Sequence, residues 1–341
     1  MAASAVDTRA GAPVNVLANV LANAPVDAPV DAPVDAPVDA LRHALGRVMH
    51  GKAEVIELLL VAVLGGGHVL VEDVPGVGKT TLAKALARAF RATFTRVQFT
   101  PDLLPSDILG AQVLHPKDGS FSFQRGPVFT NVLLADEINR ASPRTQSALL
   151  EAMSEAQATV DGVTHPLPRP FLVIATQNPV DYQGTYPLPE AQLDRFLLRV
   201  GVGYPPPEDE LRMLYARQRE DPLASVTPVA STDDLLALQA EVREVEMKEA
   251  VGRYLLALVT ATREHRALSL GVSPRGALAL FRAAQARAFL EGRRYVSPDD
   301  VQSLAVPVLA HRLALTTQAR YGGLTGAAVA EEIVAATPVP T

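Results

Sequence analysis

The chain has 341 residues, 48% of them hydrophobic, which is enough apolar material for the core of one large or two ordinary globular domains. It has no cysteine, so disulfides, thiolate zinc sites and a cysteine nucleophile are excluded, and a reducing, cytoplasmic location is expected. The net charge of −6 argues against a surface that mainly binds nucleic acid, and no uncharged apolar run reaches the ~20 residues of a membrane span, so no membrane insertion is expected.

The first 40 residues are of low complexity. The tetrapeptide Ala-Pro-Val-Asp occurs four times between residues 24 and 39, and a proline at every fourth position is incompatible with a continuous helix. We therefore predict that residues 1–40 form a disordered tail. From residue 41 the apolar side chains recur at helical spacing until three glycines precede the first strand.

A phosphate-binding loop is predicted where an apolar strand ending at Glu72 is followed by glycines and a strong helix former. Backbone N–H groups, a lysine and a hydroxyl occur in the order that such a loop requires, although Asp73 stands where the pattern G-x-x-x-x-G-K-[ST] begins with glycine. The structural alternative is an ordinary glycine turn between strand and helix. The residues predicted to contact a nucleotide are Val74, Pro75, Gly76, Val77, Gly78, Lys79, Thr80 and Thr81.

Further strands alternate with helices up to about residue 204, which favours a doubly wound parallel sheet in an α/β domain over residues 41–204. Two hairpins are predicted near 112–125 and 158–165, and a short helix over 101–109 is expected to be broken by Pro105. Beyond three consecutive prolines the pattern predicts an all-helical domain over residues 205–341. Its expected helices span 208–219, 232–246, 248–265, 274–290, 298–313 and 326–336.

Polar residues with catalytic potential follow two of the apolar strands. Asp136 is placed to hold Mg²⁺ together with Thr80, and Glu137 beside it could take the proton of an attacking water. Asn178, after a neighbouring strand, would reach the same water and the γ-phosphate of ATP. Taken singly, each of these residues could belong to an ordinary strand end or turn, but their order behind a phosphate-binding loop favours nucleotide hydrolysis.

The sequence resembles the MoxR family of AAA+ ATPases over about residues 41–335. The resemblance implies an α/β P-loop domain, a C-terminal helical lid, ATP and Mg²⁺ as cofactors, and a homo-oligomeric ring, expected to be a hexamer, with ATP between subunits. It also implies that Asn178 is the sensor-1 residue, Arg195 the arginine finger and Arg275 the sensor-2 arginine, acting in its own subunit or on its neighbour. The motifs that carry it lie at 72–80, 126–129, 134–140, 145–153, 175–179 and 186–196.

These motifs suggest three candidate functions, which they support to different degrees. The leading one is an ATP-driven, chaperone-like remodeller or maturation factor for a client protein. The resemblance also implies a partner with a von Willebrand factor A domain, and Phe121 and Phe123 on the first hairpin could grip a polypeptide or belong to the core. The alternative is a nucleic-acid motor, which the nearly neutral hairpin tips disfavour. A scaffold that binds ATP without hydrolysing it conflicts with intact Asp136 and Glu137.

Overall fold

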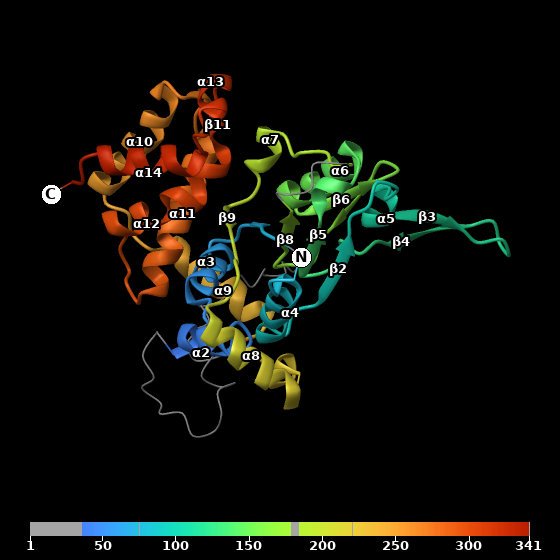
Figure 1. Ribbon diagram of the computed structural model, residues 1–341. Helices are drawn as coiled ribbons and strands as arrows, with labels where there is room; N and C mark the ends of the chain where they lie inside the picture. The colour runs from blue at the N-terminus through green and yellow to red at the C-terminus, as the bar shows by residue number, and fades with distance from the viewer. Residues whose placement is uncertain (1–35, 75, 179–183, 220, 341) are drawn as a thin grey trace, which may run out of the picture.

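The computed structural model describes residues 36–74, 76–178, 184–219 and 221–340. A five-stranded parallel sheet lies at the centre of the N-terminal part, in the order β2-β5-β8-β1-β9 (Figure 1). Within the described residues, no helix has the length and apolarity needed to cross a membrane. The strands are β1 (Val69–Glu72), β2 (Phe94–Gln98), β5 (Val132–Asp136), β8 (Leu172–Gln177) and β9 (Leu198–Val200).

Both faces of the sheet are buried. Successive side chains along each strand point to opposite faces of the sheet, and each face packs against its own hydrophobic core. Leu134 and Ile174 face a core formed with helices α3 (Ala53–Leu64) and α4 (Lys79–Ala89). Leu133 and Val173 face a second core, to which α6 (Pro143–Glu155) contributes Leu149 and Leu150. The predicted doubly wound α/β fold is therefore confirmed.

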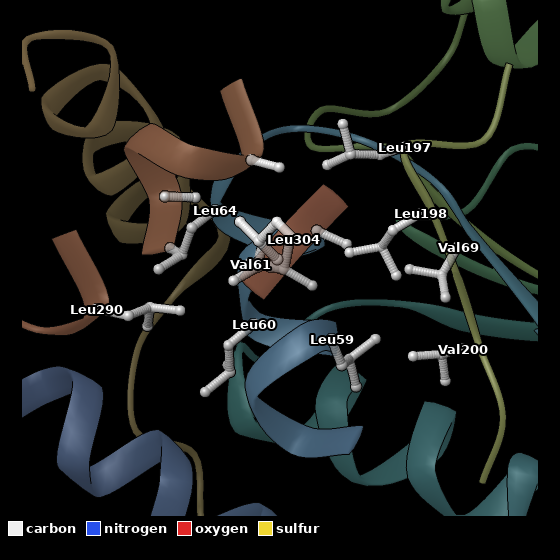
Figure 2. Close-up of a cluster of buried hydrophobic side chains, with 14 of the residues drawn as sticks. Leu59, Leu60, Val61, Leu64, Val69, Leu197, Leu198, Val200, Leu290 and Leu304 are labelled. Atoms are coloured by element: carbon white, nitrogen blue, oxygen red, sulfur yellow. The ribbon is translucent and has the colours of Figure 1, made fainter. Parts of the chain in front are cut away.

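The C-terminal helices form a lid that shares the first of these cores. Leu290 of α11 (Pro274–Leu290) and Leu304 of α12 (Pro298–Leu309) lie with Leu60 and Leu64 of α3 and Leu198 of β9 (Figure 2). The remaining C-terminal helices are α8 (Pro207–Arg219), α9 (Thr232–Arg243), α10 (Glu249–Glu264), α13 (Thr317–Tyr321) and α14 (Gly326–Ala336), with 3-10 turns at Pro222–Ser225 and Ala310–Arg312.

Both predicted hairpins are present, as β3 (Gly110–Leu114) with β4 (Phe121–Arg125) and as β6 (Gln157–Val160) with β7 (Val163–Pro166). The first extends away from the rest of the molecule (Figure 1). Its Phe123 stacks on His165 of the second hairpin with ring centroids 4.0 Å apart, so it joins the two hairpins. Phe121 is 67% exposed, so of the two phenylalanines only Phe121 offers a free ring.

Three sequence expectations need correction. Helix α2 (Ala36–Gly46) begins inside the predicted tail, because Pro37 lies in its first turn, where a proline is tolerated, and Val38 is buried. Residues 1–35 lie outside the described part of the chain. Pro105 begins helix α5 (Pro105–Leu109) rather than breaking one. The lid is not purely helical, since β10 (Leu268–Leu270) pairs with β11 (Ala314–Leu315).

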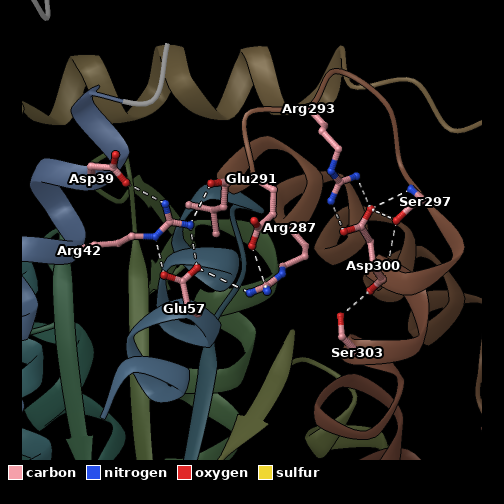
Figure 3. Close-up of polar contacts among 10 residues, drawn as sticks. Asp39, Arg42, Glu57, Arg287, Glu291, Arg293, Ser297, Asp300 and Ser303 are labelled. Atoms are coloured by element: carbon pink, nitrogen blue, oxygen red, sulfur yellow. Dashed lines mark hydrogen bonds and ion pairs between the residues drawn. The ribbon is translucent and has the colours of Figure 1, made fainter. Parts of the chain in front are cut away.

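Helix α2 is tied to the rest of the fold by a cluster of charged side chains (Figure 3). The Arg42 guanidinium donates to both carboxylate oxygens of Glu57 on α3, at 2.5 and 3.0 Å, and to the carbonyl oxygen of Leu290 at the end of α11, at 2.9 Å. Burial lowers the pKa of Arg42, but its hydrogen bond to Glu57 dominates, and the net shift is upward. Helix α2 is thereby fixed to both domains.

Candidate functional site

The loop between β1 and α4 has the backbone geometry of a phosphate cradle. Gly76 has φ +90° and Gly78 has φ +94°, a region that residues with a side chain rarely adopt. Gly78 is the N-cap of α4, so the helix begins at Lys79 with its free N–H groups directed at the loop. The Lys79 ammonium donates to the carbonyl oxygens of Asp73 at 2.9 Å and Val74 at 3.1 Å.

Asp73, the residue that departs from the glycine pattern, has a structural role. Its φ is not positive, so this position does not require glycine. Its carboxylate accepts hydrogen bonds from the backbone N–H of Val74 at 2.7 Å and from the backbone N–H of Gly203. The side chain thus fixes the start of the loop to the segment that follows β9.

Asp136 and Glu137 are braced by one hydroxyl on the neighbouring strand. Thr176 at the end of β8 donates to Asp136 Oδ1 at 2.6 Å and accepts from the backbone N–H of Glu137 at 2.8 Å. Glu137 itself has φ +57°, an uncommon conformation for a residue with a side chain. The hydrogen bond to Thr176 holds that strained backbone, which turns the Glu137 carboxylate toward the cleft.

Two residues of β2 belong to the site and were not predicted from the sequence. Arg96 Nη2 lies 2.6 Å from Asp136 Oδ2, and Gln98 Nε2 donates to Glu137 Oε2 at 2.7 Å. Gln98 is in register with Asp136 in the parallel pair β2 and β5. The available signal was their spacing, because residues i and i+2 of a strand face the same side.

These side chains line a cleft of about 320 Å³, here called the P-loop cleft, a volume at the lower end of ordinary ligand sites. Burial lowers the pKa of Lys79, while the carboxylates of Asp136, Asp73 and Glu137 act to raise it. The predicted residue Pro75 lies outside the described part of the chain, and Val74 and Val77 belong to the loop without lining the cleft. The lining residues are Gly76, Gly78, Lys79, Thr80, Thr81, Arg96, Gln98, Asp136, Glu137, Thr176 and Asn178.

The donor set of the P-loop cleft fits a hard cation held together with phosphate. Thr80 offers a hydroxyl and Asp136 a carboxylate, the oxygen ligands that Mg²⁺ accepts when substrate phosphates and water complete its coordination. Among the described residues there is no group of three or more His, Cys, Asp or Glu side chains that could hold a metal ion alone. Thr80 and Asp136 therefore fit an Mg²⁺ that is bound together with the phosphates of a nucleotide.

A second cavity of about 270 Å³ adjoins the loop and was not predicted. It shares Gly76, Gly78 and Thr81 with the P-loop cleft and extends between Met49 and Met213. Its lining mixes apolar side chains such as Met49 and Met213 with polar ones such as Lys52, and such a mixture beside a phosphate cradle suits the base and ribose of a nucleotide. No sequence motif marks it, because its walls come from segments about 150 residues apart, at 48–52 and 204–213.

Arg195 and Arg275 lie elsewhere, in a cleft of about 240 Å³ that we call the arginine cleft. Within the described residues, it shares no lining residue with the P-loop cleft. Arg195 donates through Nη1 to the carbonyl oxygen of Leu150, while its Nε is buried without a hydrogen-bond partner in the described structure. Besides Arg195 and Arg275, the charged side chains of this cleft are Asp194, Arg282 and Arg312.

His68 forms part of the wall of the arginine cleft and is a buried histidine whose two ring nitrogens both have partners. Its Nδ1 accepts from the backbone N–H of Val173 at 3.0 Å, and its Nε2 lies 3.1 Å from the carbonyl oxygen of Met153. Burial lowers the pKa of His68 to about 4, so the imidazole is neutral. It is therefore not a source of charge in this cleft at neutral pH.

Comparisons with known proteins agree with this arrangement. A family model described as "ATPase family associated with various cellular activities (AAA)" matches residues 68–198, and one described as "AAA lid domain" matches residues 260–333. The chain is 50% identical to the uncharacterized protein YeaC of Bacillus subtilis (strain 168), over 87% of this chain and 92% of YeaC. It is 45% identical to the chaperone MoxR1 of Mycobacterium tuberculosis, over 80% of this chain and 74% of MoxR1. A crystal structure from Cytophaga hutchinsonii, assigned as an ATPase, matches with a TM-score of 0.84 and 38% identity, over 90% of this chain and 96% of that chain.

Proposed function

Because the chain belongs to the MoxR family of AAA+ ATPases, we propose that it couples ATP hydrolysis to the remodelling of a client protein. The chain binds nucleotide and is an ATPase. The observation that carries the proposal is the division of catalytic groups between two clefts. Lys79, Asp136 and Glu137 converge in one cleft, whereas Arg195 and Arg275 lie in the other.

The P-loop cleft supplies the groups that act on the subunit's own ATP. Lys79 binds the β- and γ-phosphates, and Thr80 and Asp136 hold Mg²⁺, which neutralises charge on the phosphates when bound. Glu137 takes a proton from the attacking water. Gln98 and Thr176 hold Glu137 in place through hydrogen bonds to its carboxylate and to its backbone N–H. Asn178 lines the same cleft, where it positions the water and the γ-phosphate.

The arginine cleft serves the ATP of a neighbouring subunit. A cation that stabilises phosphoryl transfer must reach the γ-phosphate, and the side chains of Arg195 and Arg275 do not line the cleft of their own chain. A homo-oligomeric ring, which we take to be a hexamer, places the arginine cleft of one subunit against the P-loop cleft of the next. Arg275 then acts in trans together with Arg195.

The client is gripped by the first hairpin. Leu114 and Phe121 are opposite each other across β3 and β4, and they are 51% and 67% exposed. Such an apolar pair on a projecting hairpin suits contact with a polypeptide. The tips carry Lys117 and Asp118 on one hairpin and Asp161 on the other, which gives little electrostatic attraction for a phosphate backbone.

The proposal is tested with a variant that holds ATP without hydrolysing it. Tagged Glu137→Gln with ATP should retain a purified von Willebrand factor A domain protein from the same organism, and Lys79→Ala, which cannot bind ATP, should not. That partner should also raise the ATPase rate of the unmodified protein, whereas DNA at physiological salt should not. Salt-sensitive stimulation by DNA, without retention of the protein partner, would favour the nucleic-acid motor instead.

A further inference from the structure

Asp194 joins the two domains at the position immediately before Arg195. One carboxylate oxygen, Oδ1, accepts from Arg312 Nε at 2.7 Å, and the other, Oδ2, accepts from the Ser273 hydroxyl at 2.7 Å. Arg312 and Ser273 both belong to the lid, whereas Asp194 follows α7 (Glu190–Leu193) of the nucleotide domain. Both oxygens of this carboxylate therefore accept hydrogen bonds from lid residues.

The Arg312 side chain makes this contact specific, because it is only 2% exposed. Its guanidinium also donates to the carbonyl oxygens of Phe196 at 2.5 Å and Leu197 at 3.2 Å. Arg312 thus also binds the main chain of the two residues that follow Arg195. A buried guanidinium bonded on both sides of one residue leaves that stretch of main chain little freedom to move.

The same contacts fix the start of the helix that carries Arg275. Ser273 is the N-cap of α11 and accepts from the backbone N–H of Gly276 at 3.1 Å while it donates to Asp194. A Cβ atom at Gly276 would lie 2.8 Å from the Arg312 Cδ atom, so the first turn of α11 packs directly against Arg312. Arg275 lies between these two residues of the first turn.

By contrast, little holds the Arg195 guanidinium itself. Its recorded hydrogen bond goes to the Leu150 carbonyl oxygen, and its Nε is buried without a partner in the part of the chain that the structure describes. The position of Arg195 is therefore set mainly through its main chain, which Asp194 and Arg312 hold on either side.

We propose that Asp194 is a positioning residue that holds Arg195 and Arg275 as one unit, so that both arginines approach the neighbouring nucleotide together. The inference rests on the proposed function in trans of these arginines. It adds that a displacement of the lid moves the arginine finger, because Ser273 and Arg312 carry Asp194 with them. The lid then controls hydrolysis in the next subunit.

The principal test is the variant Asp194→Asn, which keeps the size of the side chain and removes the charge that pairs with Arg312. We expect kcat per assembled ring to fall by about 10²-fold, the loss typical of a displaced catalytic group, with less change in the KM for ATP. A kcat close to that of the unmodified protein would overturn the proposal.

Mixed rings separate positioning of the arginines from a general defect. Asp194→Asn subunits mixed with Lys79→Ala subunits should recover activity, because the second variant donates intact arginines to the ATP of the first. Asp194→Asn mixed with Arg195→Ala should recover nothing, because both lack the same donated function. Recovery in that second mixture would overturn the proposal. Failure of Arg195→Ala with Lys79→Ala would instead count against the proposed function in trans.

Ser273→Ala provides a milder variant in case Asp194→Asn does not fold. It removes one of the two lid contacts of Asp194 and leaves the pair with Arg312 intact. Ser297→Ala is a matched control, since Ser297 also caps a helix that continues with proline but has no contact with Asp194. Ser273→Ala should lower kcat several-fold more than Ser297→Ala at a similar loss of melting temperature. Equal kcat values in the two variants would contradict the inference.

Discussion

The P-loop cleft and the arginine cleft are built from the chain in different ways. The first lies where strands of one parallel sheet end, and short consecutive motifs supply Lys79, Asp136 and Glu137. The second is assembled from both domains and gathers Arg195, Arg275 and Arg312 from distant parts of the sequence. The first fits the binding and hydrolysis of a nucleotide, and we propose that the second completes that chemistry in another subunit. On this proposal each chain carries two complementary halves of an active site.

The largest effect is expected when the arginine cleft loses its finger. Arg195→Ala should lower kcat by about 10³–10⁵-fold, because a finger supplied in trans stabilises charge only in the transition state. ATP binding should change little, since Arg195 does not line the P-loop cleft. Steady-state kinetics together with a nucleotide-binding assay measure both quantities. A loss of binding equal to the loss of rate would show that the two clefts are not independent.

The next largest effect lies in the P-loop cleft. Glu137→Gln should keep ATP binding and lower hydrolysis by about 10²–10⁴-fold, the range for removal of a general base. Lys79→Ala should lose binding itself, because it removes the cation at the phosphates. Binding of a fluorescent ATP analogue and phosphate release distinguish the two variants. If Glu137→Gln hydrolyses ATP at the parental rate, the proton acceptor is another residue.

A smaller effect is expected from Thr176→Val, which removes the hydroxyl shared by Asp136 and Glu137 and keeps the shape of the side chain. The kcat should fall by about 10–100-fold, as for other residues that orient a catalytic group, and unfolding should be easier by about 1–3 kcal/mol because the partly buried backbone N–H of Glu137 loses its acceptor. Thr145→Val is the control, because Thr145 is also buried and donates to the Leu103 carbonyl oxygen at 2.7 Å, outside both clefts. Equal kcat values in these two variants would refute the role of Thr176.

The smallest effect on activity is expected at the wall of the arginine cleft, where the predicted change is one of stability. Burial lowers the pKa of His68 to about 4 from 6.5, so between these values the unfolded chain binds the proton and the folded chain does not. Stability should therefore be complete above pH 6.5 and decline as the pH falls toward 4, by about 3 kcal/mol in total. Denaturant unfolding across this range measures it, and His68→Gln should flatten the slope there. An unchanged slope in the variant would assign the pH dependence to other groups.

The sequence predicted the P-loop cleft well because its motifs are local. Gly76 to Thr80 form one loop, and Asp136 with Glu137 ends one strand, so their spacing already fixes their geometry. Gln98 and Arg96 were missed because their role depends on which strand lies beside β5, a pairing that periodicity does not reveal. The compensating role of Asp73 was missed for a similar reason, since its partner Gly203 lies far along the chain.

The arginine cleft was predictable only as separate residues. The resemblance indicated Arg195 and Arg275, but their meeting in one cleft depends on how the lid packs against α3 and β9 through the shared apolar core. The pairing of Asp194 with Arg312 has no signal in the local pattern, because it joins residues 118 positions apart. Contacts of that range are set by tertiary packing, which a single sequence does not specify.

The most direct test of the shared active site is a mixture of Arg195→Ala and Lys79→Ala subunits. Each variant alone should be inactive, the first because it donates no finger and the second because it binds no ATP. In mixed rings, ATP bound by an Arg195→Ala subunit meets the intact arginines of a Lys79→Ala neighbour, so ATPase activity should return. The absence of any recovery, in rings shown by mass measurement to contain both variants, would contradict the account.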